Sequence, residues 1–97
     1  MEDTVTPLPT ALTPFVVHCK RAPFDVLIDR STRWGNPYRI GRDGTREEVI
    51  AKYRADERFR TARFVAMVKS ELRGKILGCW CAPLPCHGDV LAEIANA

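Results

Sequence analysis

The hydrophobic positions of the chain fall into short clusters whose spacing changes along the sequence. Residues 15–19 and 24–28 are mainly β-branched, aromatic and aliphatic, and each has the length of a buried strand. Residues 75–80 form a third apolar run, which Pro83 prevents from continuing. Residues 37–40 are a candidate for a short strand at the sheet edge. The pattern therefore predicts three to four short strands.

A helical spacing replaces the strand pattern over residues 45–72. Thr45 and Glu48 fit a capping box, in which the Thr45 hydroxyl accepts a hydrogen bond from the backbone N–H of Glu48. The apolar positions that follow recur at helical intervals, and a charged run interrupts them near residues 56–60. We expect two helices with a break at this point, and Gly74 suits the position after the second helix.

Residues 87–95 predict a closing helix with an apolar face and with Asp89 in its first turn, where the helix dipole favours a carboxylate. The order of elements predicts a small α/β or α+β fold, a single-layer sheet of three to four short strands packed by about three helices. Residues 1–13, rich in Thr and Pro, are expected to form a flexible leader. Residues 14–97 are expected to form a single domain.

Composition narrows the class of protein. The 97 residues are 45% hydrophobic and 28% charged, and no apolar run approaches the roughly 20 residues that a membrane span needs. The chain also opens without the basic start and apolar stretch of a signal peptide. We therefore expect a cytoplasmic protein without a membrane partner. In that reducing compartment, the four cysteines favour metal binding or catalysis over disulfides.

Three of the cysteines and one of the two histidines lie within residues 79–87. The spacing C-x-C-x4-C-H supplies three thiolates and an imidazole, which is a ligand set for tetrahedral zinc. The predicted zinc ligands are Cys79, Cys81, Cys86 and His87. The fourth ligand stays open, because His18 or Cys19 on the first strand could reach the three cysteines in place of the histidine.

The same segment also fits a catalytic site. Three cysteine ligands would leave one zinc position open to water, with His87 or Asp89 as the general base. Without metal, Cys86 beside a helix N-terminus and next to His87 would be a nucleophile of low pKa or half of a redox pair. The candidate catalytic residues are therefore Cys86, His87 and Asp89. Trp80 alternates to the other face of the predicted strand and is expected to pack in the core.

A second cluster combines positive charge with an aromatic ring over residues 30–46. Its five basic residues are all Arg, which suits bidentate phosphate contacts, and its one acidic residue is Asp43. Trp34 could stack on a base while Arg33 or Asn36 binds the base edge or a phosphate. The alternative is that Trp34 caps the small core. We favour the stacking platform, and the predicted ligand-binding residues are Arg33, Trp34, Asn36 and Arg39.

Three segments, at residues 33–37, 44–48 and 78–89, together resemble a family of small domains that is carried largely by phages and is known only as a domain of unknown function. Its recognisable motifs are W-G-N-P and C-W-C-x-P-x-x-C-H. The similarity runs from about Val16 to Asn96. The resemblance implies a phage or prophage-like source and a shared site built from both loops, but it brings no activity with it.

Together, these observations predict a small zinc-binding protein of phage type, with a pocket for a nucleotide or an exposed nucleic-acid base between the arginine-rich loop and the cysteine segment. The first alternative is an enzyme of nucleotide or nucleic-acid metabolism that uses a Cys/His pair or zinc-bound water. The second is an adaptor whose helices bind a host protein.

Overall fold

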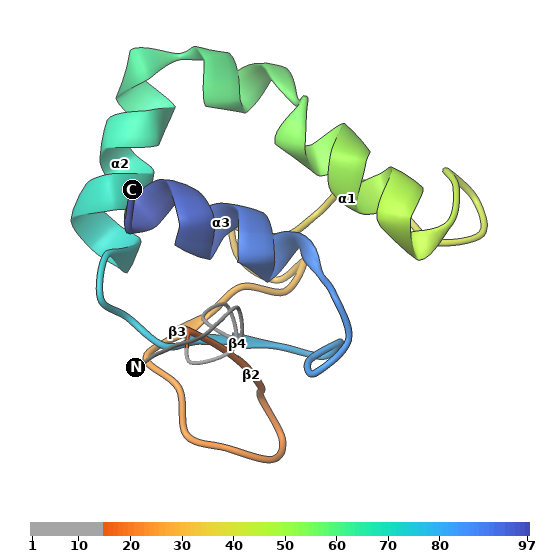
Figure 1. Cartoon of the computed structure of the whole chain (residues 1–97), viewed down its shortest axis with the longest axis horizontal. Helices are drawn as coiled ribbons and strands as arrows, with labels where there is room; N and C mark the ends of the chain where they lie inside the picture. The colour runs from red at the N-terminus through yellow and green to blue at the C-terminus, as the bar shows by residue number, and fades with distance from the viewer. Residues whose placement is uncertain (1–14) are drawn as a thin grey trace, which may run out of the picture.

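A computed structural model describes residues 15–97, so the predicted leader lies outside the described part of the chain. Three strands form one parallel sheet in the order β2-β4-β3. The strands are β2 (Val16–His18), β3 (Val26–Leu27) and β4 (Leu77–Cys79). Leu77 of β4 pairs with Val16 on one side and with Val26 on the other. The strand that leads into the cysteine segment is therefore the middle strand of the sheet (Figure 1).

Three α-helices and one 3-10 turn complete the described fold. They are α1 (Arg46–Arg54), η2 (Glu57–Arg60), α2 (Ala62–Leu72) and α3 (His87–Ala95). Helix α3 contacts both other helices and strands β2 and β4, and Figure 1 shows the helices together on one side of the sheet. The predicted small fold of three helices on a single-layer sheet is confirmed.

The helix starts follow from local sequence. Thr45 and Glu48 form the predicted capping box of α1. Helix α3 begins with a capping box in which a cysteine takes the place usual for Ser or Thr. The Cys86 thiol accepts from the backbone N–H of Gly88 at 3.3 Å, and the Asp89 carboxylate accepts from the N–H of Cys86 at 3.1 Å. This box fixes the position of Cys86 at the start of α3.

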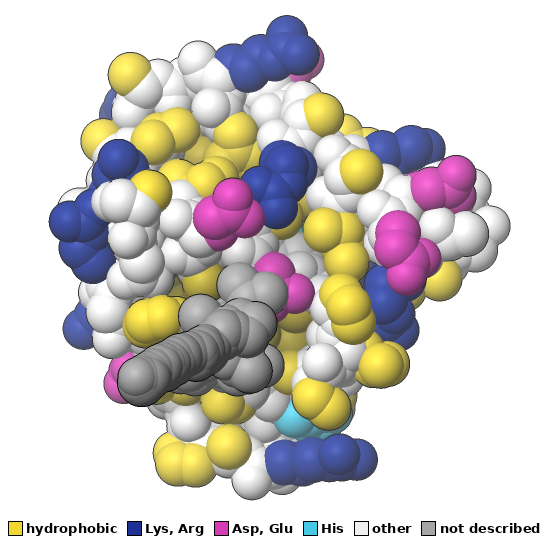
Figure 2. All heavy atoms as spheres, viewed as in Figure 1, with side chains coloured by type: hydrophobic (Ala, Val, Ile, Leu, Met, Phe, Trp, Pro, Cys, Tyr) yellow, Lys and Arg dark blue, Asp and Glu magenta, His cyan; other side chains and the backbone are white. Residues whose placement is uncertain are grey.

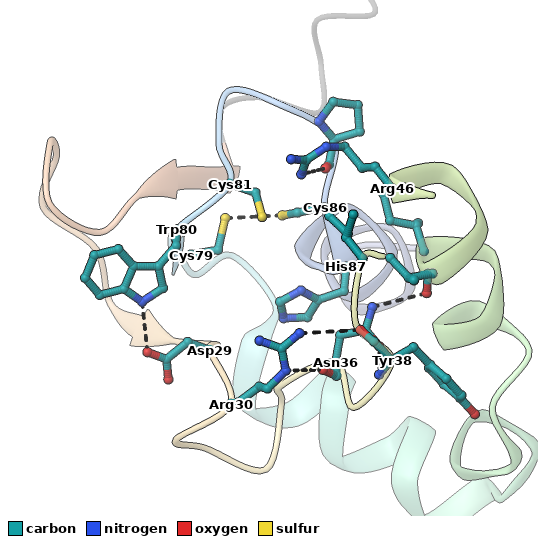
Figure 3. A pocket seen from close by; sticks show the side chains of 14 residues that line it. Asp29, Arg30, Asn36, Tyr38, Arg46, Cys79, Trp80, Cys81, Cys86 and His87 are labelled. Atoms are coloured by element: carbon teal, nitrogen blue, oxygen red, sulfur yellow. Dashed lines mark hydrogen bonds between the residues drawn. The ribbon is translucent and has the colours of Figure 1, made fainter. Parts of the chain in front are cut away.

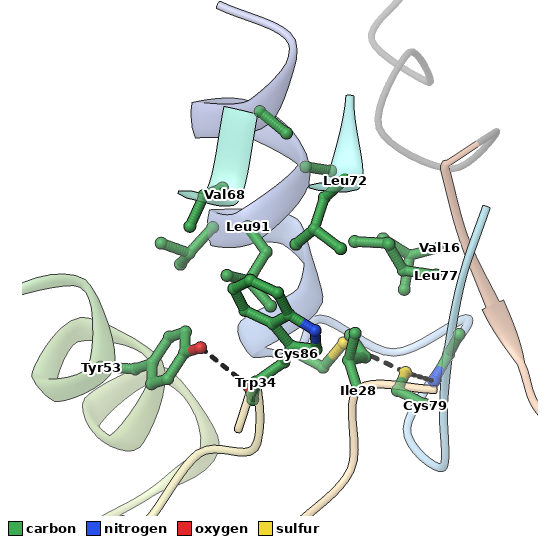
Figure 4. Close-up of a cluster of buried hydrophobic side chains, with 14 residues drawn as sticks. Val16, Ile28, Trp34, Tyr53, Val68, Leu72, Leu77, Cys79, Cys86 and Leu91 are labelled. Carbon is green, nitrogen blue, oxygen red and sulfur yellow. Dashed lines mark hydrogen bonds between the residues drawn. The ribbon is translucent and has the colours of Figure 1, made fainter. Parts of the chain in front are cut away.

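The core lies around α3, and Figure 4 shows side chains from the sheet, the helices and the loop after β3 meeting there. Gly88, in the first turn of α3, makes the close approach to the sheet possible. A Cβ atom at this position would lie 2.7 Å from Ile28 Cδ1 and 3.1 Å from Val16 Cγ1. The absence of a side chain therefore lets the first turn of α3, with Cys86 and His87, lie directly against β2 and the end of β3.

Two local predictions are wrong. Residues 37–40 form no strand, and only an isolated bridge joins Ile40 to Gly44 across a turn that needs positive φ angles at Gly41 (93°) and Gly44 (140°). Trp80 does not lie in the core, because its side chain is 53% exposed. Strand β4 ends at Cys79, so the alternation of faces on which the prediction rested does not reach the next residue.

Candidate functional site

A cavity of about 110 Å³ lies where three parts of the chain meet. The loop after β3 contributes Arg30 and Asn36, the start of α1 contributes Arg46, and the segment from Cys79 to His87 forms the remaining side. Figure 3 shows the labelled side chains of these parts around the cavity. The arginine-rich stretch and the cysteine segment thus meet at one cavity, and of the four predicted ligand-binding residues only Asn36 lines it.

The thiols of Cys79 and Cys86 are neighbours in this site, with 3.2 Å between their Sγ atoms. Cys79 is the last residue of β4, and Cys86 caps α3. The hydrogen bond from the Cys86 thiol lowers the pKa of Cys79 to about 6 against the opposing effect of burial, and the backbone N–H of Ala82 donates to the same sulfur at 3.4 Å. This contact with Cys79, together with burial, raises the pKa of Cys86. The two sulfurs thus share one hydrogen bond, and each also accepts a backbone N–H, from Ala82 at Cys79 and from Gly88 at Cys86, so the pair is suited to carrying one negative charge.

Cys81 lies in the turn after β4 and is half-buried at the edge of the cavity. Because the strand ends at Cys79, the two cysteines do not share a strand face, and Cys79 meets Cys86 instead. Within residues 15–97, no group of three or more His, Cys, Asp or Glu side chains is arranged to hold a metal ion. The four predicted zinc ligands are therefore close in the fold without forming one cluster, and zinc binding stays a prediction.

His87 and Asp89, two of the three candidate catalytic residues, make contacts that hold the start of α3. His87 Nε2 lies 2.6 Å from the backbone oxygen of Ile28, so this nitrogen carries a proton and donates it. Burial lowers the pKa of the His87 imidazole and keeps it neutral at neutral pH. The Asp89 carboxylate accepts from the backbone N–H of Cys86. Neither contact tests a role of these residues in catalysis.

Trp34 is 4% exposed and belongs to the core. Its ring packs on Phe64 at a centroid distance of 5.8 Å, and its backbone oxygen accepts from the Tyr53 hydroxyl at 2.8 Å. A ring buried in this way offers no accessible surface to a base. The core interpretation of Trp34 therefore holds, and the favoured prediction of a stacking platform is corrected.

The other three predicted ligand-binding residues differ in position. Asn36 lines the cavity and is 7% exposed, with its side-chain amide donating to Val49 O at 3.1 Å and its side-chain oxygen accepting from the backbone N–H of Tyr38 at 2.9 Å. Arg33 points to Glu71, with which it forms an ion pair at 3.6 Å. Neither Arg33 nor Arg39 lines the cavity. Asn36 therefore shapes the site mainly by holding the loop to α1.

Two other arginines of the same stretch line the cavity. Arg30 donates from Nε to Asn36 O at 2.9 Å, and Arg46 donates from Nη1 to Pro85 O at 3.2 Å. A guanidinium has five N–H donors, so these contacts orient both groups and leave further donors for a ligand. Of the five arginines in the stretch 30–46, Arg30 and Arg46 are therefore the two that bring positive charge to the cavity.

Comparison with known proteins identifies the family. A family model described as a domain of unknown function (DUF4326) matches residues 17–97. The chain belongs to the DUF4326 family. It is also 42% identical over 84 residues to an "Uncharacterized 12.4 kDa protein in nrdA-td intergenic region" of Enterobacteria phage T4, with 84% of this chain and 76% of the relative covered. No solved structure matches. The predicted resemblance to a domain of unknown function found in phages is confirmed.

The sequence of this DUF4326 domain does not show which residues line the cavity. The signal for Arg30 and Arg46 is the arginine-rich stretch itself, but only the fold selects which two of its five arginines line the cavity. Trp80 and Asp29, which also line it, carry no such signal. None of the helices within residues 15–97 has the length and apolar character needed to cross a membrane.

Proposed function

We propose that this DUF4326 domain binds the phosphate end of a small ligand in its cavity, where the Cys79 thiolate is the reactive group. The observation that carries the proposal is the meeting of two guanidiniums, Arg30 and Arg46, with the Cys79 and Cys86 pair around one cavity. Guanidiniums favour phosphate and carboxylate oxygens, with which they form paired hydrogen bonds. A cytoplasmic location is part of the proposal, because thiols stay reduced there.

The size of the cavity and the spread of charge support a small ligand over a long nucleic acid. About 110 Å³ is less than the roughly 300–1,000 Å³ of pockets that enclose a whole drug-sized ligand, so the cavity holds one end of a ligand. The net charge is only +3, and Figure 2 shows Lys and Arg side chains scattered over the visible face instead of gathered in one stripe. Nucleic-acid surfaces are usually strongly basic on one face.

The thiol pair adds chemistry to the binding site. A thiolate is the nucleophilic form of cysteine, and the neighbouring Cys86 thiol favours negative charge on Cys79. Cys79 is 1% exposed, so it would react only with a group that enters the cavity. We therefore propose a cysteine-dependent enzyme that acts on a phosphorylated ligand as the activity of this site.

The test is a binding measurement at low salt with inorganic phosphate and a panel of nucleoside monophosphates. We expect saturable binding that weakens as salt rises, because exposed charge interactions are screened. Arg46→Ala should lower the affinity by roughly tenfold or more, the loss expected for charged hydrogen bonds. Arg39→Ala is the matched control and should bind normally. No binding by the folded protein would reject the proposal and favour the adaptor.

Zinc binding is the second candidate, and the position of the cysteines supports it. The Sγ atoms of Cys79 and Cys86 lie 3.2 Å apart, and two thiolates on one tetrahedral zinc lie roughly 3.8 Å apart. Cys81 lines the same cavity and could approach if the turn after β4 moved. His87 is held by the backbone oxygen of Ile28, so its Nδ1 atom would have to be the ligand.

Elemental analysis of protein purified without a chelator tests this candidate. We expect about one zinc per chain, lost in Cys79→Ser and Cys86→Ser and retained in the control Cys19→Ser. A chelator should lower the melting temperature, because the free energy of metal binding becomes part of the free energy of folding. Metal-free protein with an unchanged melting temperature would reject the zinc site and leave the thiol chemistry in place.

A further inference from the structure

Trp80 is an exposed aromatic residue that the structure holds in a defined orientation. Its indole N–H donates to Asp29 Oδ2 at 3.0 Å. The Lys20 ammonium lies 5.5 Å from the centroid of the ring, and the His18 ring meets it edge-on at 5.9 Å. The side chain nevertheless remains 53% exposed. An exposed tryptophan with a fixed ring is a ready contact surface for another flat ring.

The carboxylate that holds the indole is itself fixed. Asp29 accepts from the backbone N–H of Ser31 at 2.9 Å and also from the Ser31 hydroxyl. The hydrogen bonds from Ser31 and then from Trp80 lower the pKa of Asp29, so the group is ionised at neutral pH. The anchor of Trp80 is therefore a charged acceptor in a rigid turn.

Trp80 also lines the cavity that contains Arg46 and the thiol pair. Figure 3 shows Trp80 on one side of the sulfur atoms of Cys79 and Cys86 and Arg46 on the other. The negative charge of Asp29 lies at the Trp80 end, so a phosphate is repelled there and attracted toward Arg46. Trp80 thus lies at one edge of the cavity and Arg46 at the other, and Arg30 and the thiols also line it.

We propose that Trp80 is the base-stacking residue of this site and that the ligand is a nucleoside phosphate, with its base on Trp80 and its phosphate near Arg46. This inference rests on the proposed phosphate-binding function and names the ligand class for it. A nucleoside phosphate carries an anion, which matches the cavity beside Arg46, and a flat ring, which matches the exposed Trp80 ring at the edge of the cavity. Stacking on a side chain tolerates any base, because every base has a π face.

The experiment compares two ligands that differ only in the base. Isotope-labelled protein is titrated with nucleoside monophosphates and with ribose phosphate, and binding is followed by NMR, which detects weak affinities. Trp80→Ala should weaken nucleoside monophosphate binding by about 5- to 150-fold, the range measured for one stacked base. It should leave ribose phosphate binding unchanged. Trp80→Phe should retain most of the nucleotide affinity, because the phenyl ring also stacks.

Two controls separate stacking from the rest of the site. Leu84→Ala removes another exposed apolar side chain of the same turn, one that does not line this cavity, and it should alter neither affinity. Arg46→Ala should weaken both ligands. In the wild type, the indole N–H signal of Trp80 should shift with nucleotide, whereas that of the buried Trp34 should not.

The failures of the two proposals can be told apart. If Trp80→Ala weakens both ligands equally, or neither, while Arg46→Ala weakens both, then the stacking role is overturned and the phosphate-binding function stands. If the folded wild-type protein binds neither ligand, the proposed function fails and the stacking role fails with it.

Discussion

The two tryptophans of the chain lie in opposite environments. Trp34 is 4% exposed and packs on Phe64, whereas Trp80 is 53% exposed and its indole N–H is bonded to Asp29. Both are in loops, but Trp34 has polar neighbours in the sequence, whereas Trp80 lies between two cysteines in an apolar segment. The difference comes from what covers each loop, because helix α2 packs over Trp34 and β4 ends just before Trp80. Burial is therefore set by the elements around a residue and not by its neighbours in sequence.

The largest effect that this comparison predicts is on stability. Trp34→Ala should reduce the free energy of unfolding by roughly 3–5 kcal/mol, because it removes a large ring from a small core. Trp80→Ala should reduce it by less than about 1 kcal/mol, because the side chain is largely exposed. Denaturant unfolding of both variants measures the difference. Equal losses would mean that the two tryptophans do not divide into a core and a surface residue.

The loop that carries Trp34 allows a smaller test. Asn36→Ala should cost roughly 1–3 kcal/mol, because it removes the hydrogen bonds of a buried side chain to the Val49 carbonyl and to the Tyr38 N–H. We also expect weaker ligand binding, since Asn36 holds the loop that positions Arg30. Thermal melts and the phosphate titration check the two effects. A stable variant would show that the side-chain bonds of Asn36 are not needed to hold the loop.

Trp80 directly follows Cys79, the last residue of β4. The next prediction concerns the pKa of Cys79. The folded pKa of Cys79 is about 6, against an ordinary value of 9.0. The stability due to its thiolate is thus fully present near pH 9 and is lost as the pH falls through about 6. Above pH 9 the raised pKa of Cys86 acts in the opposite direction, so the gain stops there.

Ultraviolet absorbance of the thiolate, taken as the difference between wild type and Cys79→Ser, measures this titration directly. Cys86→Ala should move the midpoint up toward the ordinary cysteine value, because it removes the hydrogen bond that stabilises the thiolate. Cys86→Ser keeps an O–H donor and should move it less. A midpoint near the ordinary value in the wild type would remove the thiolate from the proposed site.

Local signals in the sequence predict the helices well but do not predict the site. Helix ends depend on residues close together in the sequence. The capping box of Thr45 and Glu48 and the glycine after α2 are both found where expected. The Cys79 and Cys86 contact depends on where β4 ends and where α3 begins, and the spacing of the cysteines in the sequence does not reveal it. Contacts of this kind follow from tertiary packing, which periodicity does not encode.

The smallest predicted effect concerns the hydrogen bond between Trp80 and Asp29. The folded pKa of Asp29 lies below its ordinary value of 3.8, so the bond to the charged carboxylate is fully present above that pH and is lost as the pH falls through the lowered pKa. The Trp80 emission, taken as the difference between wild type and Trp80→Phe, should therefore change with a midpoint below 3.8. Asp29→Asn should abolish this transition while leaving the melting temperature nearly unchanged, because the bond is exposed to water. A midpoint at or above 3.8, the ordinary pKa of an aspartate, would indicate that the Trp80 indole is not held by the carboxylate. Trp80 would then lack the fixed surface proposed for stacking, whereas Trp34 would remain a core residue.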